Sequence, residues 1–425
     1  MMINCPVPRQ IQRWLHQVLD RLPLNLNLDF WGQTALKFNH DQSASIVLHI
    51  HHPGVLRTLL LNQDPLTLVD AYLQGLIDVE GDLAAVLPFV QQYPYARVSI
   101  LQSLRTWLDA WMLPSLPNSQ TFNTPWKRLK LRTQERDRAV VQHHYDTGNS
   151  FYKLWLDPEM VYSCAYFEYS QMSLQAAQEA ILDRICRKLK LSPGETLLDI
   201  GCGWGSLLHW AVTHYGVKAH GITLSEEQLA YNQQRLTESG LSNQIIVELL
   251  DYRDLPKAPT YDKIVSVGMV EHVGVKNYPI YFQSALLALK AGGLFLNHGI
   301  TTCNRWNNSS IGERFIDRYI FPDGQLTLLS NLLTVAEAAG WEIVDVDAWR
   351  PHYAKTLQCW AKNFQAVRDQ INTLIGERQA QLWQLYLIGC ALGFKNNYMG
   401  IYQTLLRRKA DVTWNLPLTR AGWLC

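Results

Sequence analysis

The segment LLDIGCGWGS at residues 197–206 decides the fold of this chain. An apolar run ends at Ile200 and is followed directly by glycines at the alternate positions 201, 203 and 205. Glycine lets the backbone turn tightly and approach a ligand at the point where a parallel strand ends. Strand-like and helical stretches alternate from here to GGLFLNHGI at 292–300. Such alternating units predict an α/β fold with a mostly parallel, doubly wound sheet.

The loop and the strand after it narrow the choice of ligand. A strict G-x-G-x-x-G dinucleotide loop needs Gly or Ala at position 206, which is Ser. Asp199 before a G-x-G-x-G loop instead resembles the first motif of S-adenosylmethionine-dependent methyltransferases, with a dinucleotide site or a tight structural turn as alternatives. The second strand ends in GITLSEEQ (221–228), without the acidic residue that usually holds a ribose in such enzymes. Another side chain must therefore hold the ribose.

The composition is that of a folded chain with balanced charge. Of its 425 residues 48% are hydrophobic, and 38 Lys and Arg face 37 Asp and Glu. The absence of a basic excess argues against nucleic acid as a partner. The eight cysteines lie far apart without a C-x-x-C pair, which predicts reduced thiols and no metal site. The sequence has neither the apolar core of a signal peptide nor an apolar run of about 18 residues, so we expect a cytoplasmic protein with peripheral membrane contact.

Changes in composition divide the chain into three parts. Residues 1–122 mix helical and strand-like patterns and predict a small α+β domain. Its strand candidates are residues 34–38 and 45–51. Residues 123–142 form a basic linker or helix, in which KRLKLRTQERDR (127–138) is either a solvated helix face or a contact for anionic lipid headgroups. Residues 143–425 are the predicted catalytic domain.

Five segments, in order along the chain, carry a family resemblance. They are HHYDTGNSFYKLWLDPEMVYSCAYFE (143–168), GITLSEEQ (221–228), SVGMVEHVG (266–274), FPDGQL (321–326) and PHYAKTL (351–357). From about residue 140 onward the chain closely resembles cyclopropane-fatty-acyl-phospholipid synthases and the related mycolic acid cyclopropane synthases. The N-terminal domain resembles that of the phospholipid synthases, because the mycolic acid enzymes are shorter. The resemblance implies a Rossmann-like class I methyltransferase fold, an unsaturated phospholipid substrate, an N-terminal domain for lipid engagement and a homodimer.

The resemblance also implies two sets of site residues. S-adenosyl-L-methionine would be held by Tyr145, Tyr162, Ser163, Gly201, Gly203, Thr223, Leu224, Gln228, Tyr252 and Arg253. A bicarbonate ion at the reacting centre would be surrounded by Cys164, Glu271, His298, the backbone of Ile300, Tyr353 and Cys390, with Tyr145 as the aromatic residue that stabilises a cation. The residues alone leave plainer interpretations open. Glu271 and His272 could be a helix N-terminal pair, His298 a hydrogen-bonded strand end, and the two cysteines inert buried thiols.

The chemistry that such groups would perform is ring formation on an alkene. A sulfonium methyl is electrophilic, so its transfer to a cis double bond needs positioning, and ring closure then needs a base in a dry pocket. We therefore predict an S-adenosylmethionine-dependent enzyme that converts double bonds of phospholipid acyl chains to cyclopropanes, with bicarbonate as general base. Two alternatives remain. One is a lipid C-methyltransferase that leaves a methylene or methyl branch, and the other is a lipid-binding protein with an inactive methyltransferase fold.

Overall fold

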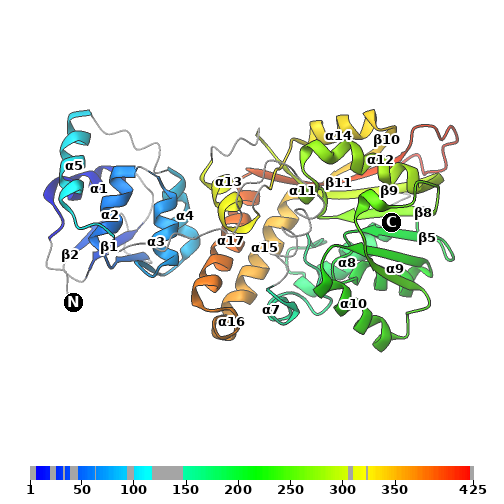
Figure 1. Cartoon of the computed structure of the whole chain (residues 1–425), viewed down its shortest axis with the longest axis horizontal. Coiled ribbons are helices and arrows are strands. Elements are labelled where there is room, and N and C mark those ends of the chain that lie inside the picture. The colour runs from blue at the N-terminus through cyan, green and yellow to red at the C-terminus, as the bar shows by residue number, and fades with distance from the viewer. Residues whose placement is uncertain are drawn as a thin grey trace. The chain divides into compact units, whose positions relative to one another are not determined.

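The chain forms two compact units in the computed structural model (Figure 1). The first consists of residues 1–127 with the segments 309–315 and 381–389, and the second of the remaining residues. The structure describes residues 6–19, 25–31, 34–38, 46–62, 64–92, 100–116, 147–304, 310–321 and 324–421. The predicted basic linker at 123–142 and the predicted site residue Tyr145 lie outside the described residues.

The first unit is an α+β fold around a four-stranded sheet. Its strands are β1 (Leu26–Phe30), β2 (Thr34–Phe38), β3 (Ile46–Ile50) and β4 (Ile77–Glu80), in the order β2-β1-β3-β4. The β1 and β3 strands pair in parallel, and the other neighbours are antiparallel. Buried and half-buried residues alternate along β1 and β3, as in a sheet with one face on the core.

Helices complete this core. They are α1 (Arg9–Leu19), α2 (Pro53–Asn62), α3 (Leu66–Leu73), α4 (Leu83–Gln92) and α5 (Ile100–Met112). Ile11 of α1, Val55 of α2 and Ala110 of α5 have no exposed surface and belong to the same apolar cluster as the strands. The α+β prediction is therefore confirmed, and both strand candidates are strands. The strand β1 was missed because LNLDF is short and has Asn and Asp at its alternate positions.

The second unit is built on a seven-stranded sheet in the order β10-β11-β9-β8-β5-β6-β7. Its strands are β5 (Thr196–Ile200), β6 (Lys218–Thr223), β7 (Ile245–Leu249), β8 (Tyr261–Val267), β9 (Leu289–Thr302), β10 (Trp341–Ala348) and β11 (Met399–Arg408). The five strands from β9 to β7 are parallel, while β11 is antiparallel to both β9 and β10. This arrangement confirms the mostly parallel, doubly wound α/β fold.

Helices cover both faces of this sheet. Figure 1 shows α8 (Leu174–Lys188), α9 (Ser206–Tyr215) and α10 (Glu226–Ser239) on one side, and α12 (Tyr278–Ala288) and α14 (Leu329–Ala338) on the other. Ser173 and Ser225 cap α8 and α10 by accepting a backbone N–H three residues later. Shorter helical segments are α7 (Asn149–Lys153), η2 (Tyr252–Asp254), α11 (Val270–Val273), η3 (Val275–Asn277), α13 (Ile311–Phe315) and η4 (Ile316–Ile320).

Between β10 and β11 the chain forms three helices before it returns to the sheet. They are α15 (Arg350–Ala366), α16 (Arg368–Ile375) and α17 (Glu377–Lys395). Two predicted site residues, Tyr353 and Cys390, come from this insertion. Among the described helices, none combines the length and the apolar character needed to cross a membrane.

Candidate active site

The glycine loop joins β5 to α9 and has a left-handed backbone at each of its glycines. The φ angles are +84° at Gly201, +55° at Gly203 and +78° at Gly205, a region that L-residues with a Cβ rarely adopt. Asn232 of α10 fixes the loop, since its Nδ2 donates to the carbonyl oxygens of Gly203 (2.9 Å) and Gln228 (2.8 Å). Sequence reasoning missed Asn232, because nothing in its local pattern marks an amide that reaches back to the loop.

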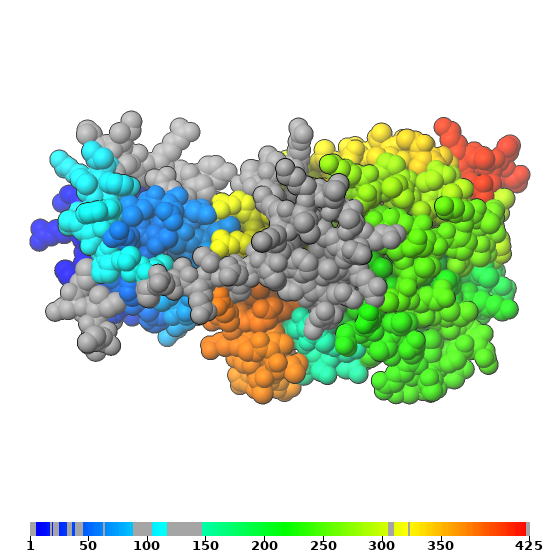
Figure 2. All heavy atoms as spheres, in the orientation of Figure 1, coloured from blue at the N-terminus to red at the C-terminus, as the bar shows by residue number. Residues whose placement is uncertain are grey.

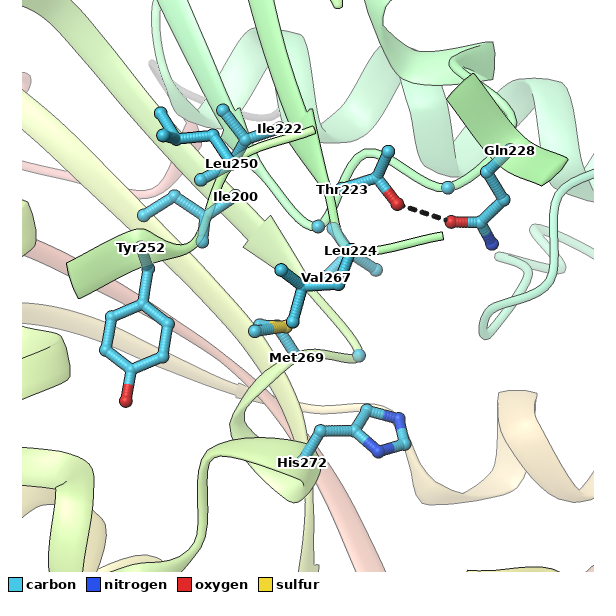
Figure 3. A pocket seen from close by; sticks show the side chains of 13 residues that line it. Ile200, Ile222, Thr223, Leu224, Gln228, Leu250, Tyr252, Val267, Met269 and His272 are labelled. Carbon is cyan, nitrogen blue, oxygen red and sulfur yellow. Dashed lines mark hydrogen bonds between the residues drawn. The ribbon is translucent and has the colours of Figure 1, made fainter. Parts of the chain in front are cut away.

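Two hollows adjoin this loop. The first is lined by Ile200, Gly201, Gly203, Ile222, Thr223, Leu224, Gln228, Leu250, Tyr252, Val267, Gly268, Met269 and His272 (Figure 3). These residues come from the carboxyl ends of β5, β6 and β8, from the turns after β5 to β8, and from the helical segments α10, η2 and α11 that follow. The predicted ligand position at the end of the parallel strands thus has a cavity.

The strand-end pair Thr223 and Gln228 occupies the place of the missing acidic residue. Both side chains are buried, and Thr223 Oγ1 donates to Gln228 Oε1 over 2.8 Å (Figure 3). Gln228 lines the first hollow. Because Thr223 binds the amide oxygen, the bond does not use the NH₂ group of Gln228. A neutral amide of this kind could hold the hydroxyl groups of a ribose.

The second hollow lies beside the loop and contains a carboxyl group. It is lined by Met160, Val161, Tyr162, Ser163, Ile181, Leu182, Ile185, Asp199, Gly201, Cys202, Gly203, Trp204, Ser206, Leu207, Gln228, Val267 and Gly268. Asp199 is 3% exposed, and its Oδ1 has no hydrogen-bond partner among the described residues. Burial raises the pKa of Asp199 to about 7. A cationic amino group placed here would satisfy this carboxyl and hold it ionised, which fits the amino acid part of S-adenosylmethionine.

A second group of predicted residues meets around Tyr353 of α15. Burial raises the pKa of Tyr353 well above its usual value, and its neighbours Tyr162, Cys164, Cys390 and Glu271 raise it further. These five side chains, which come from four separate parts of the chain, therefore lie near one another. The ring of Tyr353 also packs on Phe394, with 4.7 Å between centroids. The hydroxyl stays protonated and can donate a hydrogen bond.

Glu271 follows β8 in the short helix α11 and turns back to the sheet. Its Oε1 accepts the backbone N–H of Ile300 over 2.6 Å, while its buried Oε2 has no partner in the described part of the chain. Burial raises the pKa of Glu271 to about 7, although the bond from Ile300 opposes the shift. A carboxyl with this pKa can either give or take a proton near neutral pH.

His298 lies in β9, two residues before Ile300. It is 1% exposed, and its Nε2 is buried without a partner among the described residues. Burial, helped by the charge of Lys188, lowers the pKa of His298 to about 3, so the ring is neutral. The backbone N–H of Gly268, just after β8, donates to the carbonyl oxygen of His298 (2.9 Å). This bond continues the parallel pairing of β8 with β9 to the residue after β8.

The thiols of Cys164 and Cys390 are poor nucleophiles here. Burial raises the pKa of Cys164 well above its usual value and that of Cys390 to about 12, so both stay protonated. The weak hydrogen bonds of Cys164 go to the carbonyl oxygens of Ala165 (3.4 Å) and Trp349 (3.9 Å). These thiols can shape a pocket, but they do not attack a substrate.

Only one residue of the predicted Tyr252–Arg253 pair lines a hollow, although the Arg253 guanidinium lies over the Tyr252 ring, 5.2 Å from its centroid. Tyr252 lines the first hollow. Arg253 lines neither hollow within the described part of the chain and instead binds Asp251, with Nε to Oδ1 at 2.8 Å and Nη2 to Oδ2 at 2.7 Å. In this arrangement Arg253 orders the turn after β7, and its guanidinium is not part of the cavity wall.

Comparison with known proteins extends this description. Residues 132–404 match the family described as mycolic acid cyclopropane synthetase. A probable fatty acid methyltransferase of Pseudomonas putida is 37% identical over 410 residues, which cover 96% of this chain and 98% of the relative. Cyclopropane mycolic acid synthase 1 of Mycobacterium tuberculosis is 38% identical over 280 residues, which cover 62% of this chain and 95% of the relative.

Solved structures show the same likeness. A cyclopropane synthase from Mycobacterium tuberculosis matches with a TM-score of 0.61 and 34% identity, over 63% of this chain and 97% of its own. A mycolic acid cyclopropane synthase in complex with SAH and CTAB also matches with a TM-score of 0.61. It is 36% identical, and the match covers 66% of this chain and 100% of the synthase chain.

A doubly wound sheet with a ligand cavity at its glycine loop defines the class, which is the class I S-adenosylmethionine-dependent methyltransferases. Within that class the matched segment covers more than half of the chain. The chain belongs to the mycolic acid cyclopropane synthetase family.

Proposed function

We propose that the protein transfers a methylene group from S-adenosylmethionine to the cis double bond of unsaturated phospholipid acyl chains, forming cyclopropane fatty acids with bicarbonate as general base. The observation that carries this proposal is the cluster of Glu271, Cys164 and Cys390 near Tyr353. In it the buried Oε2 of Glu271 has no partner among the described residues. The relatives named as cyclopropane synthases support the reaction class.

Each part of the site has a task in this reaction. The glycine loop, Gln228 and Asp199 would bind the cofactor in one orientation toward the substrate. When bound, S-adenosylmethionine supplies an electrophilic methyl group, and bicarbonate supplies a base. Tyr162 packs against Trp155 (5.6 Å between ring centroids) and Trp360 (5.2 Å), which also contact each other. These rings would exclude water, which would otherwise capture a carbocation formed on the acyl chain.

A small oxyanion fits the donor set. Glu271 in its protonated form, Tyr353 and a neutral His298 each offer one proton, so an anion placed among them would be paired on several sides. Such pairing offsets the cost of removing the anion from water. With a pKa of about 7, Glu271 can also exchange a proton with that anion during turnover.

A second candidate reaction is methylation of an acyl chain without ring closure. A relative that matches both units of this chain, over 96% of its length, is named a probable fatty acid methyltransferase. The same carbocation could lose its proton after a hydride shift and leave a methylene branch. The same site could serve either outcome, because both reactions need a base beside the transferred carbon.

The first unit supports engagement of a lipid surface. One face of α5 is buried through Thr106 and Ala110, and Leu113 directly after the helix is buried as well. The opposite face exposes Leu104 (59%), Trp107 (45%), Leu108 (51%), Trp111 (60%) and Met112 (72%), and Figure 2 shows α5 in cyan at the surface. Tryptophans and long apolar side chains on one helix face are typical of helices that lie in the membrane interface. We therefore assign peripheral membrane contact to this face.

The product distinguishes the reactions. The purified protein would be incubated with S-adenosylmethionine and vesicles of an unsaturated phospholipid, and the recovered lipid examined by proton NMR. A cyclopropane gives a strongly upfield ring methylene signal, whereas a methylene branch gives vinylic protons and takes up hydrogen under mild reduction. Vinylic protons would refute ring formation, and an unchanged lipid would refute catalysis on phospholipids.

The α5 face has its own test. The double variant Trp107→Ala/Trp111→Ala should bind vesicles at least about tenfold more weakly, because losing about 100 Å² of apolar contact costs about 2 kcal/mol. Trp414→Ala is the matched control, since Trp414 of the second unit is 44% exposed. Sedimentation with vesicles measures the affinity. Equal binding of the double variant and the control would remove α5 from the membrane contact.

A further inference from the structure

A row of polar side chains crosses three neighbouring strands beside His298. In the register of the sheet, Asp347 of β10 is opposite Gln403 of β11, and Gln403 is opposite His298 of β9. Residues directly opposite on adjacent strands project from the same face of the sheet. Lys188, the last residue of α8, reaches the same row from a distant part of the chain.

These four side chains form one continuous chain of hydrogen bonds. Lys188 Nζ donates to Asp347 Oδ2 over 2.7 Å and to Gln403 Oε1 over 2.8 Å. At its other end the Gln403 amide lies 3.2 Å from His298 Nδ1. Lys188, Gln403 and His298 are each 1% exposed. Water is thus excluded from the two bonds of Gln403, so Gln403 depends on its partners in the row.

The chemistry of the groups fixes the direction of each bond. An ammonium group has donors only, so the end of the Gln403 amide that faces Lys188 has to be the carbonyl oxygen. The NH₂ end then donates to His298 Nδ1, and that nitrogen accepts without a proton of its own. A neutral imidazole carries one ring proton, which must be on Nε2. The Nε2 atom is buried and has no partner among the described residues.

We infer that Lys188 and Gln403 are positioning residues that hold His298 as the Nε2–H tautomer, so that His298 donates a hydrogen bond to the oxyanion at the reacting centre. The identity of the acceptor rests on the proposed function, but the tautomer does not. Asp347, which also lies 3.5 Å from Arg184 Nη2, balances the charge of Lys188. With the reverse tautomer, Nε2 would present a lone pair to an anion and repel it.

The tautomer can be measured directly. In protein labelled with ¹⁵N-histidine, protonated and unprotonated ring nitrogens have well separated shifts, and the signals of His298 are those lost in His298→Gln. We expect a protonated Nε2 and an unprotonated Nδ1 in the unaltered protein. A protonated Nδ1 would overturn the inference without the need for any variant of the row.

A substitution of nearly equal shape tests the control by Gln403. In Gln403→Glu the carboxylate accepts from both Lys188 and His298, so the ring proton should move to Nδ1. Turnover should then fall about 10²-fold, the effect of losing one donor at a reacting anion, while the KM for S-adenosylmethionine stays within twofold. Gln233→Glu adds the same charge at an exposed position of α10 and should change neither. Lys188→Met frees the amide to rotate and should give a mixture of both tautomers.

The outcomes separate this inference from the proposed function. An unchanged tautomer in Gln403→Glu would refute the inference even if the protein makes cyclopropane lipids. A switched tautomer with unchanged turnover would refute the role of the row in catalysis. If the unaltered protein makes no such lipid, the proposed function is refuted. A changed His298 tautomer in Gln403→Glu would still show that Gln403 determines which ring nitrogen of His298 carries the proton.

Discussion

Replacing Gly205 by alanine is expected to disrupt the cofactor loop through a contact that the sequence does not display. An added Cβ at Gly205 would lie 1.9 Å from Asn232 Oδ1, far inside the contact distance of the two atoms. Asn232 has no exposed surface, and its Nδ2 holds the carbonyl oxygens of Gly203 and Gln228. To admit the methyl group, Asn232 has to move and give up at least one of these bonds.

The magnitude has two parts. A left-handed backbone costs a residue with a Cβ about 1–2 kcal/mol, and φ at Gly205 is +78°. A buried hydrogen bond left unmade costs about 1–3 kcal/mol more. The total loss in free energy of unfolding is therefore about 2–5 kcal/mol. Gly240, at the end of α10, is the matched control, because φ is +69° and an added Cβ meets nothing within 4 Å. Gly240→Ala should lose only about 1–2 kcal/mol.

Urea denaturation followed by circular dichroism measures these differences. The double variant Gly205→Ala/Asn232→Ala provides a further check, since it removes the colliding amide. It should lose less stability than the sum of its two single variants, by about 1–3 kcal/mol. The reasoning would be refuted if Gly205→Ala were no less stable than Gly240→Ala, or if the two single effects simply added.

Further variants test the remaining site. Gly203→Val should weaken S-adenosylmethionine binding at least about tenfold by calorimetry, since φ is +55° and a side chain would enter the space beside the loop; unchanged affinity would remove the loop from the site. Glu271→Gln should lower turnover about 10²-fold or more with little effect on cofactor affinity, and full activity would contradict the assigned role. Burial raises the pKa of Glu271 from 4.5 to about 7, so between these pH values the folded state binds more protons than the unfolded state. The free energy of unfolding of the unaltered protein therefore falls as pH rises from 4.5 to 7. Glu271→Gln lacks this loss, so its free energy of unfolding in urea titrations should rise by up to about 3 kcal/mol relative to that of the unaltered protein over this pH range. Iodoacetamide at pH 8 should modify the exposed Cys303 well before Cys164 or Cys390 by peptide mass mapping, and rapid labelling of Cys164 would contradict its burial.

Local sequence determined the glycine loop and the alternation of strands and helices in the second unit. The segment 197–206 specifies a strand, a left-handed turn and a helix start by itself, because glycine conformation and strand periodicity depend on near neighbours. Thr223 and Gln228 are likewise five residues apart, so their pairing at the strand end follows from the β–α turn. The strand β1 was not recognisable, because its alternate Asn and Asp lower its strand propensity and only pairing with β2 and β3 stabilises it.

Only the tertiary structure decided which side chains act together. Lys188 and Gln403 are 215 residues apart, and Gln403 and His298 are 105 apart. Their contact follows from the sheet order β10-β11-β9, in which the antiparallel β11 lies between two strands that precede it in the chain. Packing equally produces the clash at Gly205, the pairing of Arg253 with Asp251, and the burial of Glu271 Oε2 without a partner among the described residues. The physical reason is that burial and pairing, which set pKa values and tautomers, depend on neighbours in space, whereas a motif records only neighbours along the chain.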